Sequence, residues 1–382
     1  MLKFWQVVTG GIVMKGCTAY LVLQATREGQ ASHAHVHEII NGLRQREWLV
    51  DLFEPSYVRA DRLPGAMGRL REFLIIQIRL WFKAFRKIDI VYIRSHYAAF
   101  PTSLIAKLLH ITVVQEVNGP YEDLVIAWPW TRRFLPLFKR LLRIQLKWAN
   151  AVIVVTPQLK EWVQAEVGHK YVKVIPNGAN ANLFYPQAIT HHPLPNDYVV
   201  FFGALTLWQG LDTLLKAVGD HEWPEELHLV IVGDGVERVR VEEAVARNPK
   251  VIYLGRLPYR EVPGIVAGSL AGLSPQNNQG ERSSTGLFPL KLFETLACGI
   301  PIVTTDFPGQ ADLVREYECG VVIPHDDPSA LAQAVSYLYK HPSERLKMGR
   351  RGRAVIEQEH SWDKRASDTD SVLLQVLYGG RV

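Results

Sequence analysis

The chain has 382 residues, of which 48% are hydrophobic and 21% are charged, as in a folded globular protein and unlike a disordered one. Single hydrophobic cores stop growing at roughly 250–300 residues, so we expect two domains. Its three cysteines, Cys17, Cys298 and Cys319, are odd in number and lack C-x-x-C spacing. This excludes a disulfide framework, argues against a zinc site and predicts a reducing compartment.

Charge is divided unevenly along the chain. Residues 1–186 contain 24 Lys and Arg against 13 Asp and Glu, whereas residues 187–382 contain 19 against 25. The basic half predicts a polyanionic partner, either a membrane or a nucleic acid. Residues 1–14 lack the continuous apolar core of a signal peptide and are too short to span a bilayer. We therefore expect a cytoplasmic protein that is soluble or peripheral to the membrane.

Apolar runs rich in Val and Ile alternate with helical patterns along the whole chain, which predicts parallel strands covered on both faces and two doubly wound α/β domains. A Pro-rich stretch without periodicity, 184–197, predicts the linker between them. The strands expected in the first half are 20–23, 49–53, 88–93, 112–116, 151–155 and 172–175. Those expected in the second half are 198–202, 227–232, 251–254, 271–274, 301–304 and 320–323.

Two segments of the basic half, 69–87 and 131–148, mix Arg and Lys with Trp, Phe and Leu. Basic amphipathic helices of this kind can lie in the interface of an anionic membrane. Their Leu and Phe content favours lipid over nucleic acid, so we expect no nucleic-acid partner. The alternative is a core-facing helix with a solvated basic face, and we expect Ile75, Ile76 and Ile78 in the core.

In the second half, the loops that follow strands are where a doubly wound domain binds its ligand. The loop 277–286, rich in Gly, Ser, Asn and Gln, leads into a predicted helix over 290–297 that carries Lys291 and Glu294 on one face. Amides, a helix start and a lysine suit a diphosphate, and a carboxylate suits ribose hydroxyls. The pattern predicts a sugar-nucleotide site; the alternative is an amphipathic helix with an exposed ion pair.

Six motifs occur in one order along the chain: VIPNGANANLFYP (174–186), FFGALTLWQGLDTLLKA (201–217), LVIVGDG (229–235), VIYLGRLP (251–258), PLKLFETLACGIPIV (289–303) and HSW (360–362). With them the chain resembles the retaining GT-B glycosyltransferases of the GT4 group over about residues 19–378. The resemblance implies two Rossmann-like domains facing a central cleft. Residues 1–186 would bind the acceptor and 187–361 the nucleotide sugar, and a C-terminal helix within 362–382 would return to the N-terminal domain.

The resemblance also implies roles for individual residues. Glu294 matches the carboxylate that grips the ribose hydroxyls, and Gly203 matches the glycine that lets backbone approach phosphate. Asn118 stands where many members have a histidine that contacts the donor sugar, so Lys291, Glu294 and Asn118 are the expected catalytic residues. The donor-binding set adds Gly203, Arg256, Leu257, Glu281, Arg282, Ser284, Thr285, Gly286, Leu287 and Phe288. The acceptor-binding set is Gly29, Gln30, Ser32, His33 and Glu122.

The chain departs from the family at three positions. Gly286 stands where the family usually has a carboxylate, and Ala204 and Gln209 stand where it has the Arg and Lys that bind phosphate. A diphosphate in a cleft needs positive charge. We therefore expect Lys291, with Arg282, to replace those cations, and Glu281 to stand in for the carboxylate.

The implied reaction is transfer of a hexose from a UDP- or GDP-linked donor to an acceptor hydroxyl with retained configuration, on a lipid-linked or cell-surface glycan precursor. The leaving phosphate would deprotonate the acceptor, and we expect no metal and no other cofactor. Two alternatives remain. One is a catalytically inactive GT-B fold that serves as a binding partner, suggested by Gly286. The other is a NAD(P)-dependent oxidoreductase, suggested by the partial G-x-G-x-x-G at 233–238.

Overall fold

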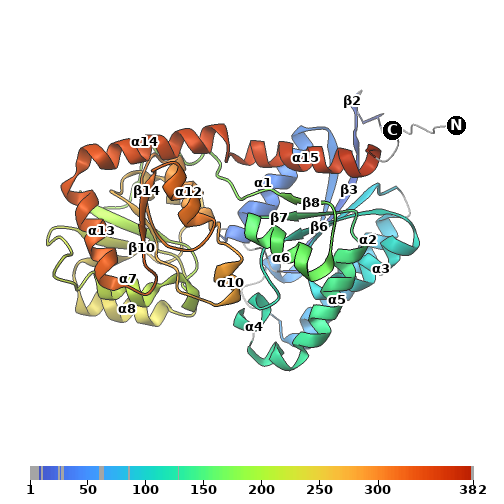
Figure 1. Ribbon diagram of the computed structural model, residues 1–382, viewed down its shortest axis with the longest axis horizontal. Helices are drawn as coiled ribbons and strands as arrows, with labels where there is room; N and C mark the ends of the chain where they lie inside the picture. The colour runs from blue at the N-terminus through green and yellow to red at the C-terminus, as the bar shows by residue number, and fades with distance from the viewer. Residues whose placement is uncertain are drawn as a thin grey trace. The chain divides into compact units, whose positions relative to one another are not determined.

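The computed structural model describes residues 8–9, 12–24, 26, 30–59, 64–84, 87–127 and 129–379. The chain forms two compact units, each built around a six-stranded parallel sheet (Figure 1). Unit 1 comprises Met1–Arg27, His35–Pro176 and Arg365–Val382, and unit 2 comprises Glu28–Ala34 and Asn177–Lys364. The prediction of two doubly wound α/β sheets is confirmed.

The sheet of unit 1 has the strand order β4-β3-β5-β6-β7-β8, and all of its neighbours are parallel. Every strand overlaps one predicted for the first half, because runs of Val and Ile buried on both faces mark parallel strands. A short antiparallel pair, β1 and β2, was not predicted. The strands are β1 (Val8–Thr9), β2 (Ile12–Val13), β3 (Gly16–Leu21), β4 (Trp48–Phe53), β5 (Ile90–Arg94), β6 (Thr112–Val117), β7 (Ala151–Val154) and β8 (Val172–Val174).

Helices cover both faces of this sheet. One face is covered by α2 and α3, and α3 packs in turn against α5 (Figure 1). The helical segments associated with this unit are α1 (Ala31–Gln45), η1 (Ser56–Arg59), α2 (Ala66–Ala84), η2 (Tyr97–Ala99), α3 (Phe100–Leu108), α4 (Asp123–Ala127), η3 (Pro129–Phe134), α5 (Leu135–Trp148), α6 (Pro157–Val167) and α15 (Trp362–Tyr378).

The helix α2 presents a face to the core that differs in part from the prediction. Phe73, Ile76 and Leu80 pack with strand residues of β3 and β5, as their spacing of three and four residues requires. Ile76 is buried and Ile75 half-buried, but Ile78 is exposed. The expectation that Ile78 is a core residue was therefore wrong, because two positions beyond Ile76 a helix has turned by about 200°.

The last helix, α15, belongs to unit 1 from Arg365 onward. Its Asp370 accepts hydrogen bonds from the Lys15 ammonium at 2.9 Å and from the Trp48 indole at 2.7 Å. Its Ala366 lies so close to Gly42 of α1 that a Cβ on that glycine would come within 2.3 Å of the alanine methyl. Partly buried polar contacts and a close packing of small residues therefore hold this C-terminal segment on the first unit.

The sheet of unit 2 has the order β11-β10-β9-β12-β13-β14, again fully parallel. In chain order this is 3-2-1-4-5-6, so the direction of winding reverses between β9 and β12, where doubly wound folds bind ligands. All six strands overlap predicted ones. They are β9 (Tyr198–Phe202), β10 (His228–Val232), β11 (Val251–Tyr253), β12 (Gly272–Ser274), β13 (Ile302–Thr305) and β14 (Gly320–Ile323).

Apolar layers cover both faces of this second sheet. Residues 177–186 belong to this unit, where Ala179 and Phe184 are fully buried in one of the layers. The helical segments are η4 (Leu207–Gln209), α7 (Leu211–Ala217), α8 (Arg238–Arg247), α9 (Val262–Ala267), α10 (Glu281–Ser284), α11 (Leu290–Ala297), α12 (Gln310–Glu316), α13 (Pro328–Lys340) and α14 (Pro342–Gln358). Among the described helices of the whole chain, none is both long and apolar enough to cross a membrane.

Candidate functional site

Three glycines lie at the carboxyl ends of adjacent strands in unit 2. Gly203 follows β9, Gly233 follows β10 and Gly255 lies after β11, and the Gly233 N–H donates to the Gly255 carbonyl at 2.8 Å. Gly203 and Gly233 have φ angles of +129° and +146°, and a Cβ on Gly233 would lie 1.8 Å from the carbonyl oxygen of Gly203. A side chain at Gly233 is therefore excluded, and backbone forms this part of the sheet edge.

The helix α11 has the bounds predicted for it, 290–297, and all eight of its residues are buried. Gly299, at φ +70°, follows its end, as the sequence indicated. Lys291 and Glu294 are 6% and 5% exposed. The alternative of an amphipathic helix with an exposed ion pair is therefore wrong. Ionisable groups are rarely buried this far without partners, so each one's surroundings matter.

The ammonium of Lys291 lies between polar and aromatic partners. It donates a hydrogen bond to Gln209 Oε1 at 2.7 Å and sits 3.7 Å from the centroid of the Phe201 ring. A Cβ on Gly203 would touch it, with 3.7 Å to the nitrogen. Burial lowers the pKa of Lys291 from 10.5 to about 7, although the Glu294 carboxylate acts in the opposite direction. An anion at this edge would favour its charged form.

The carboxylate of Glu294 is held by a residue that the sequence reading did not single out. Glu294 Oε1 accepts a hydrogen bond from the Tyr259 hydroxyl at 2.6 Å. The Tyr259 ring packs in turn against Phe184, with 5.4 Å between centroids. Tyr259 lies in the loop between β11 and α9, so this loop fixes the direction of the Glu294 carboxylate.

The segment before α11 is also tied down. Phe288 presents its carbonyl to the side-chain amide of Asn177 at 2.7 Å, and the Leu287 N–H donates to the Pro308 carbonyl at 2.9 Å. Gly286 has φ +84°, a left-handed conformation that suits glycine. Gly286, which stands where the family usually has a carboxylate, therefore has a backbone conformation that suits glycine. It lies in a loop that hydrogen bonds hold on both sides.

The loop after β12 contributes a further group of donor-binding candidates. Arg282 lies 5.8 Å from the centroid of the Trp208 ring, and with Leu287 these residues line a small hollow between η4 and the loop. Glu281 and Ser284 are exposed on α10, and the buried Thr285 donates its hydroxyl to the Arg282 carbonyl at 3.0 Å. This hollow lies at the reversal of winding between β9 and β12. The full lining is Trp208, Gln276, Asn277, Gln279, Arg282, Ser283 and Leu287.

The two candidates after β11 differ in exposure. Arg256 is exposed, whereas Leu257 is half-buried and packs against the apolar layer that contains Phe293. Both follow Gly255 directly, so they lie at the same edge of the sheet as Gly203.

In unit 1 the structure places Asn118 directly after β6, with its side-chain amide 2.6 Å from Glu116 Oε1. Glu122 is ion-paired with Lys139 of α5 at 2.7 Å. The acceptor-binding candidates at the start of α1 fall within residues 28–34, which belong to unit 2. There Gln30 is exposed, Ser32 and His33 are half-buried, and Gly29 lies outside the described residues.

The structure thus brings several predicted residues together in unit 2, namely Gly203, Lys291 and Glu294 with the loop 285–288. Five residues that contact predicted site residues were not predicted from the sequence: Phe201, Tyr259, Trp208, Asn177 and, beside Asn118, Glu116. Gln209, predicted only as the position of a missing cation, is the hydrogen-bond partner of Lys291. Lys291 and Gln209 are 82 positions apart, so no local pattern marks this pair.

The two units have GT-B architecture, and family models match both halves of the chain. The Glycosyltransferase Family 4 model matches residues 32–183, and the model described as Glycosyl transferases group 1 matches residues 187–355. Between them the two models cover most of the chain. The chain belongs to the GT4-type GT-B glycosyltransferases, so the predicted family is confirmed.

Named relatives and solved structures agree with this assignment. A "Phosphatidyl-myo-inositol mannosyltransferase" of Mycobacterium leprae is 26% identical over 249 residues, which are 64% of each chain. A "GDP-mannose-dependent monoacylated alpha-(1-6)-phosphatidylinositol monomannoside mannosyltransferase" of Corynebacterium glutamicum is 28% identical over 161 residues, 41% of each chain. The chain thus spans less than two thirds of these relatives. Sucrose-phosphate synthase from Thermosynechococcus elongatus shares the fold, with a TM-score of 0.77 at 17% identity over 96% of this chain and 100% of that one.

Proposed function

We propose that the protein is a retaining hexosyltransferase that moves a hexose from a UDP- or GDP-linked donor to an acceptor hydroxyl. One observation carries the proposal: Lys291 is buried against Gly203 at the carboxyl edge of the unit 2 sheet, with Glu294 one turn away on α11. A cation beside exposed backbone suits a diphosphate, and a carboxylate held by Tyr259 suits ribose hydroxyls.

In the proposed reaction, the bond between the anomeric carbon and the diphosphate oxygen breaks, and its electron pair leaves with the diphosphate. The acceptor oxygen bonds to the anomeric carbon on the same face, and its proton passes to an oxygen of the leaving phosphate. Lys291 and the Phe288 N–H would stabilise the charge that develops on the leaving group, because the amides of residues 285–287 already donate to protein carbonyls. The proposal assigns Glu294 to the ribose, Asn118 to the sugar, and no role to a metal or other cofactor.

The acceptor that we propose is lipid-linked and lies at the cytoplasmic face of an anionic membrane. The support is the outer face of α2, where Met67, Leu70, Leu74, Ile78 and Phe82 recur every three or four residues and are 48–79% exposed. A row of apolar side chains over four helical turns is unusual for a surface that contacts only water.

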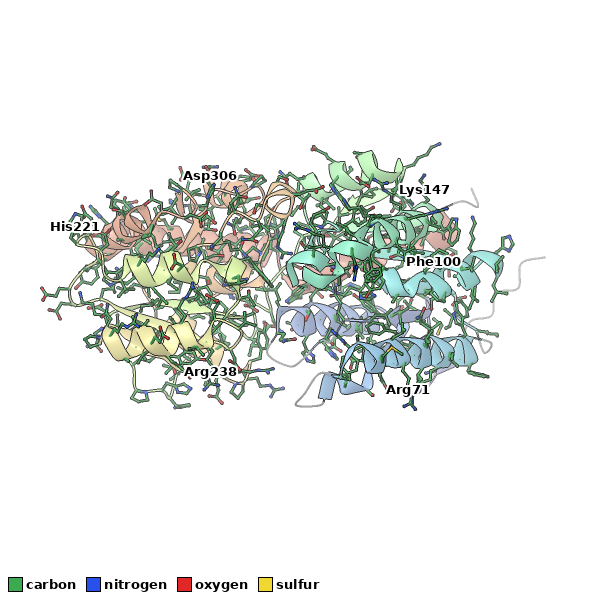
Figure 2. All side chains as sticks on the ribbon, turned by 90° about the horizontal axis from the view of Figure 1, so that it is seen from below. Arg71, Phe100, Lys147, His221, Arg238 and Asp306 are labelled. Atoms are coloured by element: carbon green, nitrogen blue, oxygen red, sulfur yellow. The ribbon has the colours of Figure 1, made fainter. Side chains whose placement is uncertain are left out.

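Basic residues accompany this row. Arg71 and Arg79 are exposed on the same helix, and Arg71 projects away from the ribbon (Figure 2), whereas the exposed Lys83 is ion-paired with Asp51 at 2.7 Å. Apolar residues that enter the interface and cations that meet lipid phosphates are the two requirements of an interfacial helix. The second basic segment, 131–148, fits less well, because its Lys139 and Arg143 are engaged by Glu122 and Glu166.

A donor panel tests the function. The full-length chain is incubated with UDP- and GDP-sugars, with sugar release or transfer and the melting temperature as readouts, and with NAD(P)H absorbance measured in parallel. We expect one nucleotide sugar to raise the melting temperature and to be turned over, with Lys291→Ala and Glu294→Ala losing most of the rate. Stabilisation without turnover would favour the inactive binding protein, and oxidation of NAD(P)H would favour the oxidoreductase.

A further inference from the structure

A buried carboxylate lies beneath the carboxyl edge of the unit 1 sheet. Glu116, in β6, is 1% exposed, and its Oε2 accepts hydrogen bonds from the hydroxyls of Tyr20 and Tyr92 at 3.0 and 2.7 Å. Tyr20 and Tyr92 are register partners on β3 and β5, with their rings stacked at 4.4 Å. This pair is at the reversal of winding in unit 1, where ligands of such folds bind.

The other oxygen of the same carboxylate faces three nitrogen groups. Glu116 Oε1 lies 2.8 Å from Arg94 Nη1, 3.0 Å from His35 Nε2 and 2.6 Å from Asn118 Nδ2. Burial alone would raise the pKa of Glu116, but His35, Arg94 and the Asn118 hydrogen bond together hold it well below its usual range. Glu116 is therefore an ionised carboxylate, which accepts hydrogen bonds and cannot donate them.

This charge state fixes the orientation of Asn118. Because an ionised carboxylate requires a donor, the Nδ2 group of Asn118 must face Glu116, and its Oδ1 oxygen must point the other way. Asn118 is half-buried, and within the described part of the chain no group donates a hydrogen bond to that oxygen. A backbone turn alone would leave this amide able to rotate and to offer either a donor or an acceptor.

We propose that Glu116 is a positioning residue that presents Asn118 Oδ1 as a hydrogen-bond acceptor at the carboxyl edge of the unit 1 sheet. The substrate group recognised there is then a hydrogen-bond donor, a sugar hydroxyl, if the proposed transferase function holds. The histidine that many family members have at this position can donate or accept. In this chain, Glu116 restricts the position to acceptance.

The proposal is tested by moving the negative charge from position 116 to position 118. In Asn118→Asp a second carboxylate would face Glu116, so we expect a lower melting temperature and a kcat about 10- to 100-fold lower, the loss typical of one hydrogen bond in the reacting complex. In the double variant Glu116→Gln/Asn118→Asp, the glutamine amide can donate to the new carboxylate. Because the glutamine loses the ion pair with Arg94, we expect the double variant to recover only part of both losses, but to have a higher melting temperature and a higher kcat than either single variant.

A matched control separates positioning from stability. Thr102→Val removes a different buried hydrogen bond of unit 1, from the Thr102 hydroxyl to Gln77 Oε1 at 2.8 Å. It should lower the melting temperature while kcat stays at the wild-type value. Glu116→Gln should lower kcat beyond what its melting temperature explains.

The melting temperatures of these variants test whether Glu116 orients Asn118, whether or not the protein is a transferase. If Asn118→Asp keeps the wild-type melting temperature, or if the double variant is no more stable than the single ones, Glu116 does not orient Asn118 and the proposal falls. That comparison needs no substrate. If the wild-type chain turns over no nucleotide sugar, the proposed function fails, while recovery of the melting temperature would still establish the orientation.

Discussion

The ammonium of Lys291 is hydrogen-bonded to Gln209 at 2.7 Å, although the two residues are 82 positions apart. The pair joins α11 to η4, the short 3₁₀ helix that follows β9. The resemblance places a phosphate-binding lysine of the family at the position of Gln209, and we propose that Lys291 of α11 supplies the cation instead. This proposed replacement is the basis of the first two predictions.

Replacement of Lys291 by Met should nearly abolish turnover without weakening the fold. Methionine fills a similar volume beside Phe201 but offers no charge to a leaving diphosphate. We expect kcat to fall by about 100- to 1,000-fold, the cost of losing one preorganised stabilising group. The melting temperature at pH 7 should not fall, because the variant no longer buries an ionisable group.

Lys216→Met is the matched control for this variant. Lys216 lies on α7 with an exposed ion pair to Asp212, which contributes little to stability or catalysis. Its initial rates should equal those of the wild-type protein. Equal rates in the Lys291→Met variant would remove Lys291 from the site.

The stability of the protein should depend on pH through the same lysine. Its folded pKa is about 7 and its ordinary value is 10.5, so between these pH values the unfolded chain binds a proton that the folded chain does not. The free energy of unfolding therefore rises with pH across this window, by about 1.4 kcal/mol per unit at most. Below pH 7 the lysine is charged in both states, and its contribution to the slope vanishes.

Urea unfolding at pH 6, 7, 8 and 9 measures this contribution as the difference between wild type and Lys291→Met. Subtraction removes the groups that titrate equally in both proteins. We expect the difference to be flat up to about pH 7 and then to change in favour of the wild type. Parallel curves from pH 7 to 9 would show that the folded protein does not depress the pKa of Lys291.

Glu294 should determine whether the protein distinguishes ribose from its deoxy forms. If its carboxylate accepts from ribose hydroxyls, the wild-type protein should bind UDP or GDP at least about tenfold more tightly than the analogue that lacks both hydroxyls, as charged hydrogen bonds require. Glu294→Gln should reduce that ratio. Calorimetric titration of both ligands into both proteins measures it.

Tyr259→Phe is the informative control, because it removes the hydroxyl that holds Glu294 but leaves the carboxylate in place. A smaller reduction in the ratio is expected than for Glu294→Gln. The assignment of Glu294 to the ribose is contradicted if Glu294→Gln weakens both ligands by the same factor.

The strands were predictable because parallel strands covered on both faces leave a local mark, a run of Val and Ile such as V-I-V at 230–232. The bounds of α11 were predictable for a similar reason, since Pro289 and Gly299 mark its two ends. These features depend on neighbours along the chain. They predict where a helix or strand begins and ends, but not which residues its side chains contact.

The residues that contact the site residues could not be predicted from local sequence patterns. The Glu116 cluster assembles residues of three strands and of α1, and none of their local patterns differs from that of an ordinary strand or helix. Ile78 shows the same limit within one helix, since apolar residues occupy both faces of α2 and only packing decides which face is covered. Contacts between distant segments, rather than local periodicity, determine both outcomes.

The exposed face of α2 should bind anionic membranes. We expect the full-length chain to sediment with vesicles of mixed phosphatidylglycerol and phosphatidylcholine at low salt and to be released near 1 M salt, where the screening length falls to about 3 Å. Ile78→Glu/Phe82→Glu should lower the bound fraction at least tenfold, because each apolar side chain contributes roughly 1.5–3 kcal/mol when buried. Both residues are exposed, so the fold should be retained.

The comparison variant for this surface is Leu346→Glu/Val239→Glu, which places two charges at exposed apolar positions of unit 2. Its vesicle binding should match the wild type, because neither α14 nor α8 has the row of apolar residues found on α2. Equal losses in both double variants would mean that added negative charge, rather than the α2 face, weakens binding. A wild-type chain that stays in the supernatant with anionic vesicles at low salt would reject the membrane surface, and the lipid-linked acceptor would lose its structural support.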